Sequence, residues 1–155
     1  MATNYTTKSA GDWETTGQVV WNEVGKPVSG DRITSFAHNI TPSVSEVVGT
    51  SPSTGGLAAI TWGGAATLLV GAGISITAQG NAIPGNAGII QIEAGGTFQF
   101  KPASGQLYGF DSDVGQSWRI IANGTSGSHA TLQTDKSLGG LSSIHVQTWG
   151  YVYTG

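Results

Sequence analysis

The acidic residues are the first candidates for chemistry, because cleavage of a glycosidic bond needs two carboxyl groups held close together. The chain of 155 residues has nine aspartate and glutamate residues. Asp111 and Asp113 lie two positions apart in a glycine-rich stretch, where they could bind calcium together with backbone carbonyl groups. A solvated turn explains the same pair more simply. The sequence therefore predicts no metal site, with Asp111 and Asp113 as the candidates if one exists.

The histidines and small nucleophiles show no arrangement that is typical of catalysis. His38, His129 and His145 are far apart, and none has an acid or a second histidine at ligand spacing. No nucleophile elbow accompanies the serines, and Gly71-Ala72-Gly73 lacks the lysine and the helix of a phosphate loop. We expect a protein that is not an enzyme and that needs no cofactor.

Aromatic side chains near the end of the sequence are the remaining candidates for binding. Trp149, Tyr151 and Tyr153 alternate along the chain, so in a strand they share one face. Such a face could stack against sugar rings or contact a partner chain. An ordinary interior row of aromatic residues is the alternative.

The composition limits the kinds of partner. Charged residues make up 10% of the chain and the net charge is −3, so no basic patch is present to bind nucleic acid. The chain has no cysteine and hence no disulfide framework, and its first residues lack the pattern of a signal peptide. The uncharged stretch 57–76 is interrupted by four glycines, which favours strands over a membrane span.

The stretch 88–101 has the clearest strand pattern in the chain. Apolar Ile90 and Ile92 alternate with polar residues, and after Gly95-Gly96 the alternation resumes with Phe98 and Phe100. A period of two with one apolar face predicts half-buried β-strands. Residues that favour strands are common along the whole chain and no window has a helical period, so we expect an all-β protein.

A short unit appears three times at a spacing of sixteen residues. Ile60, Ile76 and Ile92 are in step, and each is followed four positions later by a glycine, the last being Gly96. Short strands that end in glycine corners at fixed spacing predict a stacked β-solenoid. In that interpretation the three isoleucines form an interior row, and Gly96 adopts backbone angles that other residues resist.

A second interpretation of the same stretch remains open. Ala94-Gly95-Gly96 could be the loop of a hairpin in which Ile92 faces Phe98. Antiparallel hairpins of this kind build a jelly-roll sandwich.

The chain divides into a polar N-terminal arm, residues 1–12, and a single β-solenoid domain, residues 13–155. Trp13 and Trp21 are expected to close the first coil of that domain.

Several short motifs stand out along the chain: Trp13, Val20-Trp21, Lys26-Pro27, Gly30-Asp31-Arg32-Ile33, His38-Asn39-Ile40 and Ile92-Glu93-Ala94-Gly95-Gly96-Thr97-Phe98. The first five resemble the opening of bacteriophage virion structural proteins, in which two tryptophans precede a turn and strand of the form V-P-x-x-G-D-x-V-x-I and then G-H-x-V. The last resembles a later motif of that family, I-x-x-G-G-T-L-x-F, and the family shares its architecture with the surface domain named for eight conserved glycines. The resemblance covers residues 13–101, and more loosely 118–148. The chain departs from the pattern at Val20, Lys26 and Ala37.

The resemblance implies a right-handed parallel β-helix and a virion location after synthesis in the host cytoplasm. It implies a non-enzymatic structural component of a bacteriophage particle: a capsid decoration, head-fibre or tail-fibre protein. The expected partners are further copies of the chain, with a homotrimer favoured, and a capsid or tail protein. A glycan-binding adhesin module with a cell-surface glycan as partner is the alternative, and a polysaccharide-degrading tailspike is a third.

Overall fold

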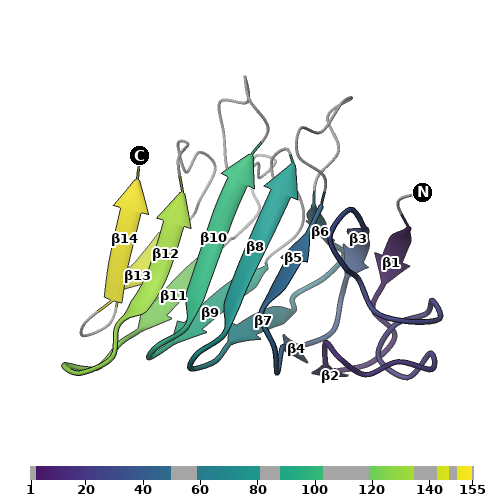
Figure 1. The fold of residues 1–155 in the computed structure, drawn as a ribbon, viewed down its shortest axis with the longest axis horizontal. Coiled ribbons are helices and arrows are strands. Elements are labelled where there is room, and N and C mark those ends of the chain that lie inside the picture. Colours follow the sequence, from purple (N-terminus) through teal and green to yellow (C-terminus); the bar gives the residue numbers. More distant parts are fainter. Residues whose placement is uncertain are drawn as a thin grey trace.

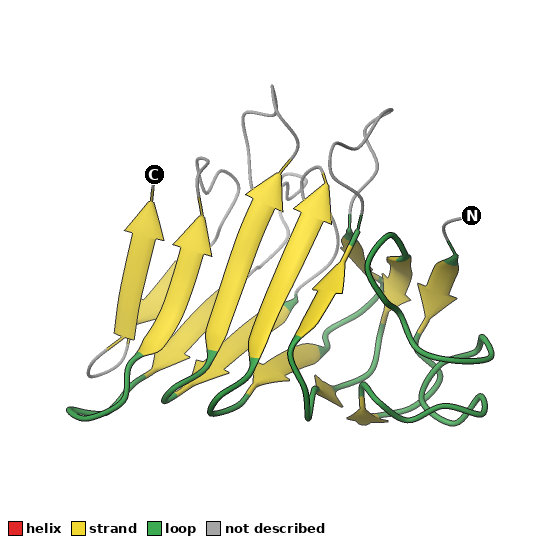
Figure 2. Ribbon diagram, in the orientation of Figure 1, coloured by secondary structure: helices red, strands yellow, loops and turns green. Residues whose placement is uncertain are grey.

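The computed structural model describes residues 3–49, 59–80, 88–102, 119–134, 143–146 and 150–154. Within these residues the chain forms strands and loops and no helix (Figure 2). The strands belong to three sheets, and every pair of neighbouring strands within a sheet is parallel. The all-β prediction is therefore confirmed.

The smallest sheet has three strands in the order β1-β3-β6, which are Asn4–Thr6, Arg32–Phe36 and Ile60–Trp62.

The largest sheet has six strands in the order β13-β11-β9-β7-β4-β2. Their bounds in that order are Ser143–Val146, Arg119–Asn123, Ile89–Glu93, Thr67–Val70, Ile40–Thr41 and Gly11–Asp12.

The third sheet has five strands in the order β14-β12-β10-β8-β5. Their bounds in that order are Gly150–Thr154, Ala130–Thr134, Thr97–Pro102, Ser75–Gly80 and Glu46–Val48.

The chain moves from sheet to sheet rather than back and forth within one. From β3 to β8 it visits the three-, six- and five-stranded sheets in turn, twice over, and from β9 to β14 the described strands alternate between the six- and five-stranded sheets. The five-stranded sheet lies in front of the six-stranded sheet in Figure 1, with β14 at one end of the molecule and β1 at the other.

The hairpin interpretation of Ala94-Gly95-Gly96 is wrong. The strands on either side, β9 and β10, lie in different sheets: β9 pairs with β7 and β11, and β10 pairs with β8 and β12. The amide of Gly95 donates to the carbonyl of His129, and the amide of Thr97 donates to the carbonyl of Ile74. Because these bonds join the turn to neighbouring turns instead of closing a hairpin, the antiparallel jelly roll is excluded for the described strands.

Apolar side chains from all three sheets fill the space between them. In the six-stranded sheet Leu68, Ile90 and Ile120 are in register, and in the five-stranded sheet Ile76, Phe98 and Leu132 are in register. All six side chains are fully buried. The period of two that the sequence shows around Ile90 and Phe98 is thus the alternation between the core and the outer faces.

The spacing of sixteen residues is not the structural repeat. Ile60, Ile76 and Ile92 are all fully buried, as predicted, but they lie in the three-, five- and six-stranded sheets respectively. They do not form one row. Ile76 is in register with Phe98, and Ile92 with Val70, so the residues that stack on each other are further apart in sequence than sixteen.

The N-terminal segment takes part in the fold. Residues 4–6 and 11–12 are strands of two different sheets, and Tyr5 is buried. Trp13 and Trp21 are fully buried and pack edge to face, with ring centroids 5.3 Å apart. The indole of Trp13 donates to the carbonyl of Pro27, and that of Trp21 to the carbonyl of Trp13. We call residues 13–30 the cap segment, because these side chains belong to the core at its N-terminal end.

Gly96 is needed for a reason other than the one predicted. The left-handed backbone angle lies at its neighbour Gly95, with φ of 80°, and not at Gly96. A Cβ atom added to Gly96 would lie 2.6 Å from the carbonyl oxygen of Val70. Close approach of two backbone segments excludes a side chain there.

Candidate functional site

The predicted aromatic contact residues lie in part within the described chain. Tyr151 and Tyr153 belong to β14 and pair in register with Thr131 and Gln133 of β12. Trp149 lies outside the described residues, as do Asp111 and Asp113, the candidate calcium ligands.

The outer face of the five-stranded sheet is polar on β8, β10 and β12, whereas β5 places Val47 outward, in register with Thr77. Its outward positions on β8, β10 and β12 alternate with the buried residues and carry hydroxyl, amide and ammonium groups: Ser75, Thr77, Gln79, Thr97, Gln99, Lys101, Thr131 and Gln133. Thr77, Gln99 and Gln133 are in register, and the hydroxyl of Thr77 lies 3.5 Å from the side-chain oxygen of Gln99. Groups of this kind can donate and accept hydrogen bonds, either from water or from a polar ligand.

The outer face of the six-stranded sheet mixes apolar and polar side chains. One carboxylate oxygen of Glu93 accepts hydrogen bonds from the amides of Gln91 and Asn123. The side-chain oxygen of Asn123 is buried and accepts no hydrogen bond from any residue that the structure describes. Glu93 lies in β9 of this sheet, whereas Lys101 lies in β10 of the five-stranded sheet.

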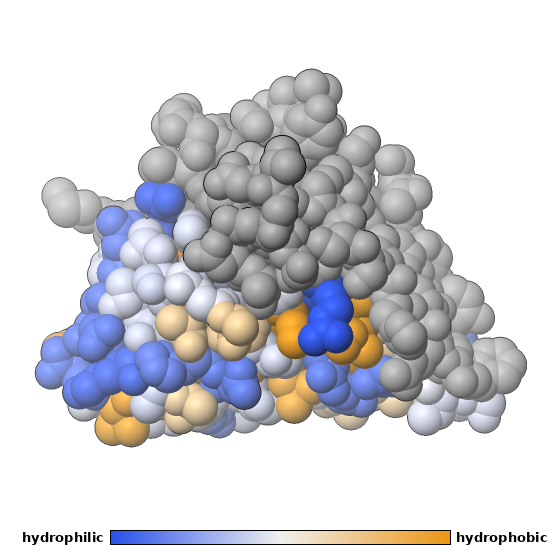
Figure 3. Space-filling view, turned by 180° about the vertical axis from the view of Figure 1, so that it is seen from behind, coloured by the Kyte–Doolittle hydropathy of each residue, from blue (hydrophilic) through white to orange (hydrophobic). Residues whose placement is uncertain are grey.

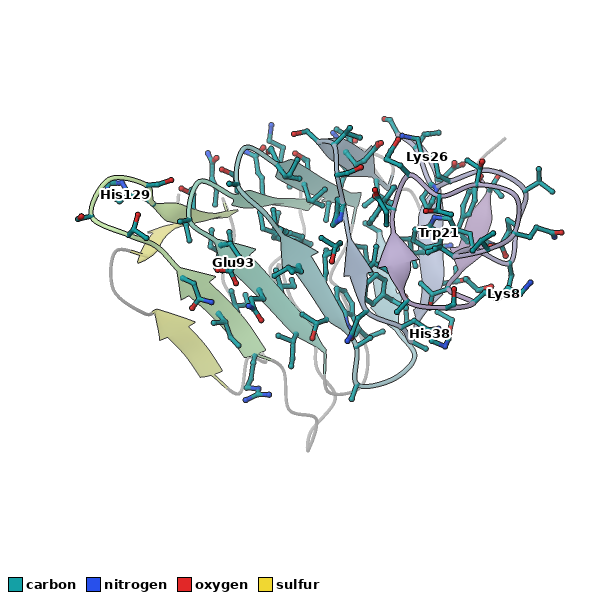
Figure 4. The ribbon with its side chains drawn as sticks, turned by 90° about the horizontal axis from the view of Figure 1, so that it is seen from below. Lys8, Trp21, Lys26, His38, Glu93 and His129 are labelled. Carbon is teal, nitrogen blue, oxygen red and sulfur yellow. The ribbon has the colours of Figure 1, made fainter. Side chains whose placement is uncertain are left out.

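A cluster of ionised groups joins the cap segment to the five-stranded sheet. The ammonium of Lys26 lies 2.5 Å from a carboxylate oxygen of Glu14 and 2.5 Å from one of Glu46. Glu46 belongs to β5, whereas Lys26 lies in the cap segment, at the end of the molecule where Trp21 is also labelled in Figure 4. Sequence reasoning did not find this cluster, because its three members are separated along the chain and no motif links them.

The electrostatic state of the cluster follows from its burial. Burial raises the pKa of Glu46, and the Glu14 carboxylate raises it further, against the opposing effect of Lys26. Burial acts to lower the pKa of Lys26, but its hydrogen bonds to Glu14 and Glu46 outweigh burial and raise that pKa. The shared ammonium of Lys26 therefore links the two carboxylates, and we call this cluster the clamp, because it connects the cap segment to β5.

Asp12 has a separate structural role. Its carboxylate accepts hydrogen bonds from the backbone amides of Glu14 and Ser43. These hydrogen bonds lower the pKa of Asp12, and the bond from the amide of Glu14 has the largest effect.

The Gly30-Asp31 pair of the resemblance has a structural role. Asp31 is 8% exposed, and its carboxylate accepts hydrogen bonds from the amides of Thr3 and Val28. Gly30 has a φ of 95°, an angle that favours glycine. Together they hold the turn from which β3 starts.

His38 contacts the hydroxyl of a residue in the N-terminal segment. Its Nδ1 atom lies 3.2 Å from the hydroxyl of Thr7, which accepts from the amide of Ala37 and donates to the carbonyl of Ser35. His129 lies at the opposite end of the molecule from His38 (Figure 4). Across the residues whose positions are described, no three acidic or histidine side chains gather as metal ligands would.

No family model, no curated protein and no solved structure matches the chain. In the described ranges there is also no helix with the length and apolar character needed to span a membrane.

Proposed function

We propose that the three parallel sheets are the faces of a right-handed parallel β-helix, and that the chain is a non-enzymatic structural component of a bacteriophage particle. The β-helix proposal rests on the continuous rows of inward-facing side chains, such as Ile76, Phe98 and Leu132. Between the strands that contribute to one row, the chain passes through another sheet. Parallel strands joined by crossovers in one sheet are almost always connected with a right-handed turn. A stack of such turns is a rigid rod.

The described polar groups favour a structural role over catalysis. Glu14 and Glu46 are held by Lys26, Asp31 by backbone amides, and Glu93 by two side-chain amides. Carboxylates engaged in this way stabilise the fold and are poorly placed to exchange protons with a substrate.

The virion assignment rests on the resemblance of residues 13–101 to phage structural proteins. The resembling residues include the two tryptophans of the cap segment and the Gly30-Asp31 turn before β3, which have structural roles here. A rigid structural component of a particle acts through symmetric contacts. We therefore propose a homo-oligomer, with a trimer favoured, that docks on a capsid or tail protein.

Fractionation of particles tests this proposal. A bacterial culture that carries the gene is induced, and particles are purified on a density gradient and probed with an antibody against the chain. We expect the chain to sediment with intact particles and to be lost from particles made by a deletion strain. Its recovery only in the unsedimented fraction, while particles form normally, would count against a virion role.

A glycan-binding module is the second candidate, and one observation favours it. Tyr151 and Tyr153 are in register with Thr131 and Gln133, which belong to the polar outer face of the five-stranded sheet. Tyrosines that alternate along a strand, next to a strand with hydroxyl and amide residues, suit the recognition of sugar rings. Binding on a glycan array that is lost in a Tyr151→Ala, Tyr153→Ala variant, and kept in a Lys8→Ala variant, would support this candidate.

A further inference from the structure

The outer faces of the two larger sheets differ in character. Outward positions on the five-stranded sheet carry polar groups on β8, β10 and β12, whereas β7, β9 and β11 of the six-stranded sheet place Leu69, Ile89 and Ile121 outward. These three alternate with fully buried neighbours such as Leu68, Ile90 and Ile120, so their outward position is set by the register. Seen from behind, the described surface shows apolar groups directly beside hydrophilic ones (Figure 3).

The three apolar side chains surround one amide. Leu69 and Ile121 are the register partners of Gln91 on its two sides, and Ile89 lies two residues before Gln91 on the same strand. Strands in a sheet are about 4.8 Å apart, so the group is compact. We call Leu69, Ile89, Gln91 and Ile121 the β9 patch.

Opposite charges flank the β9 patch. Arg119 is exposed and is in register with Ile89, at the start of its strand, whereas Glu93 lies at the end of β9. Four residues along a strand separate these two rows by about 13 Å. The surface therefore has a cation on one side, a carboxylate on the other, and apolar groups between.

We propose that the β9 patch is the surface on which a second copy of this chain docks, with Arg119 of one copy facing Glu93 of its neighbour. Charge complementarity favours a second copy of the chain as the partner, because each copy has an arginine on one side of the patch and a glutamate on the other. The start of the strands in one copy meets the end of the strands in the next. Because the same patch takes part on both copies, the contact has two-fold symmetry, and the Arg119–Glu93 pair occurs twice across it.

This inference rests on the homo-oligomer part of the proposed function and not on its virion part. Self-association through the β9 patch without incorporation into particles would refute the virion assignment alone. Incorporation of a chain that is monomeric in solution at all concentrations would refute the homo-oligomer and the docking inference together, and would leave the virion assignment standing.

Sedimentation of the whole chain tests the proposal. We expect the unmodified protein to form a discrete oligomer, and a Leu69→Gln, Ile121→Gln variant to sediment as a monomer. The matched control is Thr77→Gln, Thr131→Gln on the outer face of the five-stranded sheet, which should associate like the unmodified protein. A monomeric unmodified protein, or a patch variant that still forms the same oligomer, would overturn the proposal.

Charge exchange tests the pairing without altering the apolar residues. Arg119→Glu and Glu93→Arg should each weaken association at least tenfold, and the two changes together should restore it in part. Arg119 is exposed, so its substitution leaves the core intact; a melting curve equal to that of the unmodified protein verifies this. Association that is indifferent to both single substitutions would contradict the proposed contact.

Discussion

The ammonium of Lys26 lies 2.5 Å from the Glu46 carboxylate, at a position where the sheet register calls for an apolar residue. Glu46 pairs with Ile76, and the row continues through Phe98 and Leu132, all three fully buried. The row therefore begins with a carboxylate whose side chain is only 11% exposed to water. Lys26 makes this tolerable, because it neutralises the charge and at the same time fastens the cap segment to β5.

Replacing Lys26 by methionine should destabilise the fold by about 1–2 kcal/mol, because hydrogen bonds to charged groups are lost and two carboxylates face each other unpaired. Urea denaturation monitored by tryptophan fluorescence measures the loss. Lys8→Met is the matched control: Lys8 is exposed and donates only to the carbonyl of Gln18 among its described contacts. Equal midpoints for the two variants would show that the clamp contributes nothing.

Stability should fall in alkaline solution. The raised pKa of Lys26 means that its contribution is complete below its ordinary value of 10.5 and is lost as the pH rises through the higher folded value. Burial, followed by the charges of Asp31 and Glu23, raises the pKa of Tyr5 above 10.0, and this contribution is lost in the same direction. Urea midpoints measured between pH 8 and pH 12 should decline less steeply in Lys26→Met and in Tyr5→Phe. A decline identical in all three proteins would assign the effect to other groups.

Substitution of Ile76 by aspartate should cost about 3–5 kcal/mol or prevent folding, because a buried carboxylate without a partner is expensive. Thr77→Asp, one position along on the outer face, should cost less than about 1 kcal/mol. Thermal melting by circular dichroism compares the two. Similar melting temperatures would show that the alternation between core and outer face is misplaced in β8.

Gly96→Ala should destabilise by about 2 kcal/mol or more, because the new methyl group would overlap the carbonyl oxygen of Val70 and the backbone would have to shift. Gly73 has open space and a φ of 74°, so Gly73→Ala should cost about 1 kcal/mol from backbone strain alone. Gly127→Ala, with open space and no such angle, should be near neutral. Denaturant midpoints that do not follow this order would reject close approach as the reason for Gly96.

Local patterns predicted the strands well and their partners poorly. The alternation around Ile90, Ile92, Phe98 and Phe100 correctly identified four buried side chains, because facing the core is a property of the strand itself. Whether β9 turns back on itself or leaves for another sheet depends on hydrogen bonds from Gly95 and Thr97 to distant carbonyl groups. The sequence of residues 88–101 alone could not predict those bonds, because the accepting carbonyl groups belong to Ile74 and His129.

The functional surfaces show the same limit. Tyr151 and Tyr153 could be selected from their alternation, but their relation to Thr131 and Gln133 needed the register of β12 and β14. Glu46 looks like an ordinary surface acid in the sequence, and only its pairing with Ile76 places it at the head of an interior row. The β9 patch was hidden for a similar reason, because Leu69, Ile89 and Ile121 come from three separate strands.

The parallel pairing also sets how this chain must reach its native state. Thr97 pairs with Thr131, thirty-four positions on, and even the nearer partners Ala130 and Gly150 are twenty positions apart. None of the described strand pairs can form from a local turn. A long segment must therefore lose conformational entropy before the contacts of the first strand pair offset that loss. Such a topology folds slowly. The cap segment, with its buried tryptophans and its ion pair to β5, covers the N-terminal end of the sheets that this slow process must assemble.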